Sequence, residues 1–187
     1  MKFFVIILLV FITLNAYPHP HVFIDVEADI EIKDGKISSI TQRWVFDEMF
    51  SSMVLMDYDK NRNNRIDLNE INDLKKDYFD YLAHSSFFTF IKYGKKTIKF
   101  TKATDFMPNT SNRKLIYSFR LQPDVPVDAA NADILIYDPT YYSSVKLVNV
   151  RSNADNRIVT IKYGNLTQER YYYGQISPEA ISIRSKK

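Results

Sequence analysis

The sequence predicts an α+β fold, a mostly antiparallel β-sandwich with a helix–loop–helix unit inserted at about residues 45–84. Two observations support this prediction. Short segments rich in β-branched and aromatic residues recur along the chain, with turn signals such as Asp34-Gly35 between them, and this pattern is typical of antiparallel sandwiches. Residues 45–84 differ, because there the apolar residues recur at helical spacing on both sides of a polar segment.

The N-terminus has the pattern of a secretory signal peptide over residues 1–16. Lys2 is followed by an apolar run from Phe3 to Ile12, and the small residue Ala16 marks the expected cleavage point. The run is shorter than the roughly 20 apolar residues that cross a bilayer, so we prefer a cleaved signal to an uncleaved anchor. The prediction is a periplasmic or secreted mature chain, residues 17–187, that forms a single domain.

The first two predicted strands form a hairpin. Over residues 22–32 apolar residues alternate with mostly acidic ones, as expected for a half-buried strand with an acidic outer face. After the turn, residues 36–46 return as the second strand, which carries the only tryptophan, Trp44, as an expected core residue at the junction with the first helix. Further strands are predicted at residues 87–93, 97–106, 114–121, 132–137, 143–150, 157–163 and 180–183, with a loop at 122–130.

Residues 59–70, DKNRNNRIDLNE, have the spacing of an EF-hand loop, in which oxygen atoms at fixed positions surround a hard cation. Position six usually needs Gly and is Asn64 here, a residue that tolerates the left-handed backbone at modest cost. Because the set has few carboxylates, the predicted affinity is weak, about 10⁻⁴–10⁻³ M. An ion-free polar turn is the alternative. The predicted Ca²⁺ ligands are Asp59, Asn61, Asn63, the backbone carbonyl of Arg65, Asp67 and Glu70.

Apolar residues at helical spacing flank this loop on both sides, which completes an EF-hand-like unit. The sequence contains no second loop of this kind, and a lone loop favours a structural brace over a sensor. His84, near the end of the second helix, is expected to interact with the helix C-terminus rather than to bind metal. The apolar residues are Phe46, Phe50, Leu55 and Tyr58 before the loop and Ile71, Leu74, Tyr78 and Leu82 after it.

The segment that follows the predicted cleavage point, YPHPHVFID, contains His19 and His21. In an extended chain these imidazoles face the same side and could share one metal ion, with Asp25 further along that face. Imidazole suits Zn²⁺, Ni²⁺ or Cu²⁺. The alternative is a pair of exposed histidines in a tail.

Composition restricts the partners. The formal net charge of +3 is too small to imply nucleic-acid binding. The chain has no cysteine, which excludes disulfides and lipid attachment through a cysteine. A basic run alternates with apolar residues and is expected to be the solvated face of a hairpin, with a surface for an acidic partner as the alternative. It consists of Lys92, Lys95, Lys96, Lys99 and Lys102.

Four stretches together resemble one protein family: HPHVFID after a signal peptide, WVFDEMFSS, the calcium-type loop and YDPTYY. Over essentially the whole mature chain they resemble the bacterial periplasmic domain-of-unknown-function family 1007. The resemblance implies a periplasmic component of an uncharacterised ABC-type transport system, often encoded beside or fused to nickel/cobalt-type metal permeases. Two features depart from the family pattern. Relatives tend to carry Gly in place of Asn64, and Tyr17-Pro18 precede the HPH, which argues against a chelate that uses the free α-amino group.

With this resemblance, the transition-metal hypothesis extends to the YDPTYY stretch. Asp138 or Tyr142 would complete a site with His19, His21 and Asp25 if the sheet places that turn beside the first strand. The alternatives are a plain turn at Asp138 and a packed rim of the sandwich at Tyr142.

The sequence predicts a binding protein rather than an enzyme. It contains no nucleophile elbow with a Ser/His/Asp pattern, no cysteine and no HExxH motif, and the acidic pair Asp47-Glu48 is explained as the start of a helix. We expect an exported metal-handling protein, braced by Ca²⁺, that associates with a membrane metal permease or ABC-type transporter. Its oligomeric state is left open. The alternatives are a structural or adhesive domain and, less favoured, a metal-dependent hydrolase.

Overall fold

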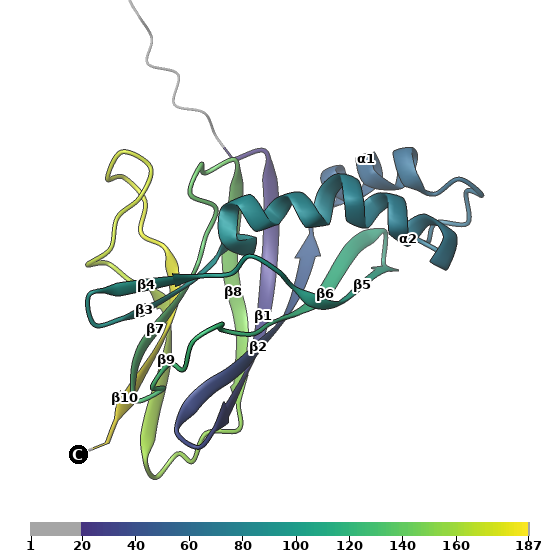
Figure 1. The fold of residues 1–187 in the computed structure, drawn as a ribbon. Coiled ribbons are helices and arrows are strands. Elements are labelled where there is room, and N and C mark those ends of the chain that lie inside the picture. The colour runs from purple at the N-terminus through teal and green to yellow at the C-terminus, as the bar shows by residue number, and fades with distance from the viewer. Residues whose placement is uncertain (1–19, 187) are drawn as a thin grey trace, which may run out of the picture.

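Residues 20–186 are described by the computed structural model, and they form two sheets and a helical unit (Figure 1). One 5-stranded sheet has the order β5-β6-β2-β1-β8, and the other 5-stranded sheet has the order β4-β3-β7-β10-β9. The strands of the first sheet are β1 (Val22–Lys33), β2 (Lys36–Phe46), β5 (Thr104–Ser111), β6 (Lys114–Leu121) and β8 (Ser143–Ser152). Those of the second sheet are β3 (Thr89–Tyr93), β4 (Lys96–Lys99), β7 (Asn131–Ile136), β9 (Val159–Asn165) and β10 (Glu179–Ser185). The α+β class with sandwich-like sheets is therefore confirmed.

β1 is the central strand for positioning the sites. It forms the predicted hairpin with β2, and the turn residues Asp34 and Gly35 have φ values of 52° and 71°, in keeping with a two-residue turn that requires positive φ. On its other edge β1 pairs in parallel with β8, and Val22 lies opposite Ser143. The other strand pairs in the described part of the chain are antiparallel. The parallel pair brings the beginning of β1 beside the turn that precedes β8.

The inserted unit consists of α1 (Glu48–Tyr58), α2 (Leu68–Leu74), a π-helical turn η1 (Lys75–Phe79) and a 3-10 helix η2 (Asp80–Phe88). In Figure 1 it lies against one end of the first sheet, near β2 and β6. The helix predicted after the loop is thus a single helical run whose hydrogen-bonding pattern changes along its length. No helix within residues 20–186 is long and apolar enough to cross a membrane.

Asp47 fixes this unit to the first sheet. Its Oδ1 accepts a hydrogen bond from the backbone N–H of Phe50 (2.9 Å) and caps α1, while its Oδ2 accepts one from the N–H of Phe23 in β1 (2.8 Å). The carbonyl of Asp47 accepts a hydrogen bond from the Ser51 hydroxyl (2.5 Å), and the same Ser51 Oγ accepts one from Leu115 N–H in β6 (2.8 Å). The first turn of α1 is therefore held by β1 and β6 together.

One predicted strand, residues 97–106, is wrong as a single strand. β4 ends at Lys99 in the second sheet and β5 begins at Thr104 in the first, so the chain crosses between the sheets in between. Phe100 anchors the crossing, because its side chain is buried and its N–H donates to Ser86 Oγ (2.8 Å). The apolar and polar residues of 97–106 alternate as in one strand, but burial of the Phe100 side chain favours a crossing between the two sheets at that position.

The strand predicted to begin at residue 87 begins instead at Thr89. Ser86, Phe87 and Phe88 have φ values of 57°, 49° and 54°, in the left-handed region that extended backbone does not use. Phe87 and Phe88 are both buried. Burial of these two rings accompanies a kinked helix end that apolar periodicity alone does not reveal.

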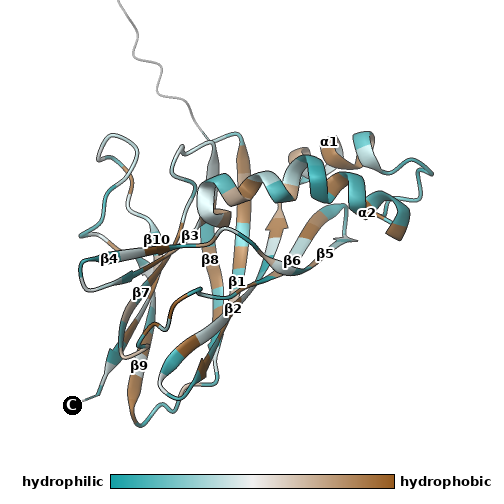
Figure 2. Cartoon of the chain, viewed as in Figure 1, coloured by the Kyte–Doolittle hydropathy of each residue, from teal (hydrophilic) through white to brown (hydrophobic). Residues whose placement is uncertain are grey.

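The core lies between the sheets and beneath the helical unit, and Trp44 is part of it, as predicted. Trp44 is 1% exposed and stacks on Phe88 with ring centroids 5.5 Å apart. Its indole N–H donates to Gln42 Oε1 (2.8 Å), and Gln42 Nε2 donates to Thr89 Oγ1 (2.8 Å). These buried bonds join β2 of one sheet to β3 of the other. Figure 2 shows apolar residues recurring along the strands, whereas the loop between α1 and α2 is hydrophilic.

We predict that Asp47→Ala lowers the free energy of unfolding by about 1–3 kcal/mol, because it removes a helix cap and the acceptor for Phe23 N–H. Urea denaturation at neutral pH measures the change. The matched control is Glu48→Gln in the same helical turn. Glu48 forms an exposed ion pair of 3.4 Å with Arg113, so its replacement should change stability little. Equal effects of the two substitutions would contradict the anchoring role of Asp47.

Candidate functional site

The loop between α1 and α2 folds around the carboxylate of Asp59. Asp59 is 8% exposed and accepts hydrogen bonds from the backbone N–H groups of Asn63 (3.0 Å) and Asn64 (2.6 Å). Asn64, at loop position six, has a φ of 62°, so it adopts the left-handed conformation for which Gly is usually needed. The sharp bend of the predicted EF-hand-like loop is therefore formed with Asn in place of Gly.

Glu70 closes the loop. It is 3% exposed, and its two carboxylate oxygens accept hydrogen bonds from Lys60 N–H and Asp67 N–H, both at 2.8 Å. Lys60 lies at the beginning of the loop and Asp67 precedes α2, so one carboxylate ties both ends together. The Lys60 side chain adds an exposed ion pair with Asp73 in α2 (2.6 Å).

Asp67 is the acceptor for the amide side chains of the loop. Its Oδ2 receives hydrogen bonds from Asn61 Nδ2 (2.8 Å) and Asn63 Nδ2 (2.7 Å). These two bonds, first that from Asn61 and then that from Asn63, lower the pKa of the Asp67 carboxyl group. The Oδ1 of Asn63 accepts from the N–H of Arg65 (2.8 Å).

The structure thus places the predicted ligands Asp59, Asn61, Asn63, Asp67 and Glu70 within one closed loop with Arg65. Their side chains carry only oxygen acceptors and amide donors, which suits a hard cation and not a soft one. In the conformation described, however, the carboxylates accept N–H groups, and no three His, Cys, Asp or Glu side chains among residues 20–186 gather as a metal-binding group. To bind a cation, Asp67 and Glu70 would have to exchange N–H partners for the ion.

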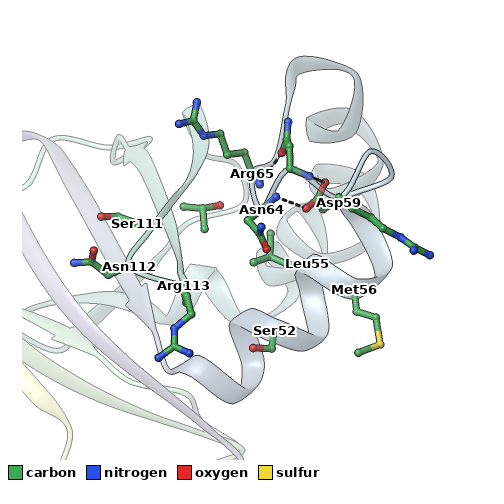
Figure 3. Close-up of a pocket in the computed structure, with 12 residues that line it drawn as sticks. Ser52, Leu55, Met56, Asp59, Asn64, Arg65, Ser111, Asn112 and Arg113 are labelled. Carbon is green, nitrogen blue, oxygen red and sulfur yellow. Dashed lines mark hydrogen bonds between the residues drawn. The ribbon is translucent and has the colours of Figure 1, made fainter.

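A pocket of about 610 Å³ lies beside this loop (Figure 3). Asp59 and Asn64, joined by their hydrogen bond, form one wall, and Asn112 and Arg113 of the turn between β5 and β6 lie across from them. Leu55 from α1 forms part of the floor. The loop is therefore accessible from the side of the first sheet.

The sheet brings the YDPTYY stretch beside the first strand, as the transition-metal hypothesis requires. His21 N–H donates to the Tyr142 carbonyl (2.8 Å), and the two rings lie 5.1 Å apart. Asp25 is exposed and pairs in register with Lys146 of β8, further along the strand. His19 lies outside the described residues, as does the predicted signal peptide.

Asp138 has a different role from the one suggested for it. It is 3% exposed, and its oxygens accept hydrogen bonds from Thr140 N–H (2.9 Å), Thr140 Oγ1 (2.7 Å) and Ser143 N–H (2.9 Å). In the sequence analysis a plain turn was the alternative to a metal ligand at Asp138, and these hydrogen bonds are those of a turn. The carboxylate therefore shapes the turn that presents Tyr142, and it has little capacity left for a metal ion.

A cavity of about 510 Å³ lies between the helical unit and the ends of β1, β2 and β6. His84 lies at this cavity, where its ring is 5.0 Å from that of Tyr81. Asp138 and Tyr142 are also lining residues. The sequence gives no signal for this cavity, because its walls come from segments that are far apart in the chain.

Comparison with known proteins fixes the family. A family model described as "Protein of unknown function (DUF1007)" matches residues 4–164. The chain belongs to this family. The DUF1007 assignment confirms the resemblance drawn from HPHVFID, WVFDEMFSS and YDPTYY.

Two similar proteins are known only by descriptive names. One is the "Uncharacterized 15.5 kDa protein in trpE 3'region" of Spirochaeta aurantia, 28% identical over 93 residues, which cover 49% of this chain and 66% of that protein. The other is an "Uncharacterized protein" of Haemophilus influenzae, 27% identical over 150 residues, which cover 76% of this chain and 69% of that protein. No solved structure matches the chain. These names report no activity, so the function of this DUF1007 protein has to be argued from its sites.

The hydrogen bonds at Asp67 make a specific prediction. In an Asn61→Ala/Asn63→Ala variant the pKa of Asp67 should rise toward the ordinary value of about 3.9, as measured by NMR titration of the carboxyl group without divalent cations. Because the folded-state pKa is lowered, the contribution of Asp67 to stability is present above its unfolded pKa and is lost as the pH falls through the folded pKa.

Asp155 is the internal control for that titration. Its pKa is lowered by hydrogen bonds from Arg157, which are independent of the calcium-type loop. It should titrate at the same pH in the wild type and in the double variant. An unchanged Asp67 pKa in the variant would show that the two amides do not determine its ionisation.

Proposed function

We propose that this DUF1007 protein is an exported metal-handling binding protein, braced by Ca²⁺ in the loop from Asp59 to Glu70, that works with a membrane metal permease or ABC-type transporter. The observation that carries the proposal is the closed loop, in which every predicted ligand atom is an oxygen and the Glu70 carboxylate is buried. The signal-peptide pattern of residues 1–16 supports export. The role is binding rather than catalysis.

The loop residues would coordinate Ca²⁺ only through oxygen atoms. Asp59, Asp67 and Glu70 would supply carboxylates, Asn61 and Asn63 amide oxygens, and Arg65 its carbonyl. When bound, the ion supplies positive charge that offsets the mutual repulsion of the carboxylates. Since Glu70 already connects the beginning and the end of the loop, binding there would stabilise the packing of α1 against α2.

The transition-metal role is assigned to the N-terminal histidines. His21 is exposed beside Tyr142 at the beginning of β1, and His19 precedes it by two residues. Two imidazoles, with Tyr142 beside His21, would form an open site for Zn²⁺, Ni²⁺ or Cu²⁺. Asp25 lies four residues beyond His21, about 13 Å away along an extended strand, and would not share an ion with it. Such an incomplete, exposed site suits transfer of a metal to a partner better than permanent storage.

We predict that millimolar Ca²⁺ raises the melting temperature of the protein. For a dissociation constant of about 10⁻⁴–10⁻³ M, ~10 mM Ca²⁺ would contribute about 1.4–2.7 kcal/mol, or several degrees. Glu70→Gln should remove most of this rise. Asp73→Asn, which changes an exposed carboxylate outside the ligand positions, should retain it. No Ca²⁺-dependent shift in the wild type would end the proposal of a calcium brace.

A second prediction concerns the histidines. Calorimetric titration with Zn²⁺, Ni²⁺ or Cu²⁺ should show binding that is lost in a His19→Ala/His21→Ala variant, because imidazole supplies the ligand nitrogens. His84→Ala is the matched control, since His84 belongs to the helical unit, and it should leave the isotherm unchanged. The same isotherm for the double variant and the wild type would exclude the N-terminal site.

A further inference from the structure

Helix α1 carries apolar residues on two opposite faces. One face is directed into the fold and includes Ser51 and Val54, both 0% exposed. The opposite face carries Met49, Met53 and Met56, whose spacing places them in one stripe along the helix. These three residues are 70%, 46% and 83% exposed. Because a helix on the surface of a domain usually presents polar residues to the solvent, the methionine stripe needs an explanation other than packing.

The outward face of α1 is distinguished by sulfur and not only by apolar character. The chain contains five methionines, and three of them lie in this stripe. The apolar residues of the same helix that pack against the core contain no sulfur. Contact with a protein partner would not require this separation, since leucine or phenylalanine would serve as well. The inward-facing residues are Phe50, Val54, Leu55 and Tyr58.

The spacing brings the thioether groups within reach of one ion. Residues three or four apart on a helix are neighbours, with Cβ atoms about 5–6 Å apart, and the unbranched methionine side chain is flexible. Met53 is therefore adjacent to both Met49 and Met56, whereas the outer two are about 10 Å apart along the helix axis. α1 contains no basic residue that would repel a cation. The guanidinium group of Arg113, which approaches the first turn, is paired with Glu48 (3.4 Å).

The chemistry of the thioether selects the ion. Thioether sulfur is a soft, uncharged ligand that suits Cu⁺, whereas Ca²⁺ prefers oxygen and Zn²⁺, Ni²⁺ and Cu²⁺ are bound well by imidazole. We propose that Met49, Met53 and Met56 form a surface site for a soft monovalent cation, Cu⁺ or its analogue Ag⁺, in which Met53 is the central ligand. An exposed site on a helix face leaves the bound ion open to transfer.

This site goes beyond the proposed function and does not rest on it. Neither the N-terminal histidines nor the predicted calcium ligands belong to the stripe. Figure 3 shows the side chain of Met56 projecting from α1 away from Asp59 and Asn64. The soft-metal site and the calcium-type loop are therefore separate on the same helical unit.

The test is an NMR titration of the purified protein, with isotope-labelled methionine methyl groups, by silver nitrate in chloride-free buffer. Ag⁺ is used because it stays monovalent without added reductant. The methyl resonances of Met49, Met53 and Met56 should shift together and reach saturation. The resonance of Met107, an exposed methionine in β5, should not move. Zn²⁺ should leave all four unchanged, because its protein ligands are thiolate, imidazole and carboxylate.

Leucine variants separate metal binding from apolar contact, since leucine keeps a similar apolar volume and removes the sulfur. Calorimetry in the histidine double variant described above measures Ag⁺ affinity without the N-terminal imidazoles. Met49→Leu/Met53→Leu/Met56→Leu should abolish Ag⁺ binding, and Met107→Leu should retain it. Met53→Leu should weaken binding more than Met49→Leu or Met56→Leu, because it leaves two thioethers that are not neighbours.

Two results would overturn the inference: absence of Ag⁺-dependent shifts in the three stripe methyl groups of the wild type, or unchanged Ag⁺ affinity in the triple leucine variant. Thermal melting verifies that each variant is folded, and the wild-type NMR titration decides independently of any variant. Neither result bears on the proposed function, whose tests use Ca²⁺ at the loop and divalent transition metals at the histidines.

Discussion

The Asp47 carboxylate determines where the functional parts of this protein lie. One oxygen caps α1 and the other accepts from β1, while Ser51 one turn later connects the same helix to β6. The direction of α1 is thereby tied to the first sheet. Because α1 leads into Asp59, the calcium-type loop is held at a fixed place, and the second helical run must return over the same end of the sheet. The cavity beneath it is a consequence of that return.

The calcium-type loop combines a preorganised backbone with ligands that are already engaged. Asn64 holds the left-handed bend, and Glu70 joins both ends, so little backbone entropy would be lost on cation binding. On the other hand, each N–H bonded to Asp67 or Glu70 must be released or rearranged. These opposing contributions agree with the weak affinity expected for a loop with few carboxylates. A loop of this kind suits surroundings in which the cation is abundant.

Much of the fold was predictable because it depends on local signals. Alternation over β1, the Asp34-Gly35 turn and the acidic start of α1 at Asp47-Glu48 are read from neighbouring residues, and the structure has all three. The crossing at Phe100 was missed, since nothing local distinguishes a buried residue between sheets from one within a strand. For the same reason the spacing of residues 59–70 predicted which polar side chains gather in the loop, whereas the sequence left open whether Asp138 forms a turn or faces a metal site.

The cavity was beyond prediction for a stronger reason. Its walls require the β6 position of Tyr117, the return of η2 and the turn before β8 to be known together. One such contact, between the YDPTYY stretch and the first strand, was considered from the sequence, but only as a condition for a complete transition-metal site. Burial of the Tyr117 hydroxyl likewise results from packing between distant segments, so no pattern in the sequence predicts it.

The parallel pairing of β1 with β8 also constrains the order of events during folding. Ile32 in β1 and Asn153 just after β8 are bonded across a sequence separation of 121 residues. The first strand to emerge must therefore remain without one of its neighbours until most of the chain has followed it. Contacts of such long range slow the search for the native topology. Until β8 has formed, the unpaired edge of β1 is the segment most exposed to pairing with other chains.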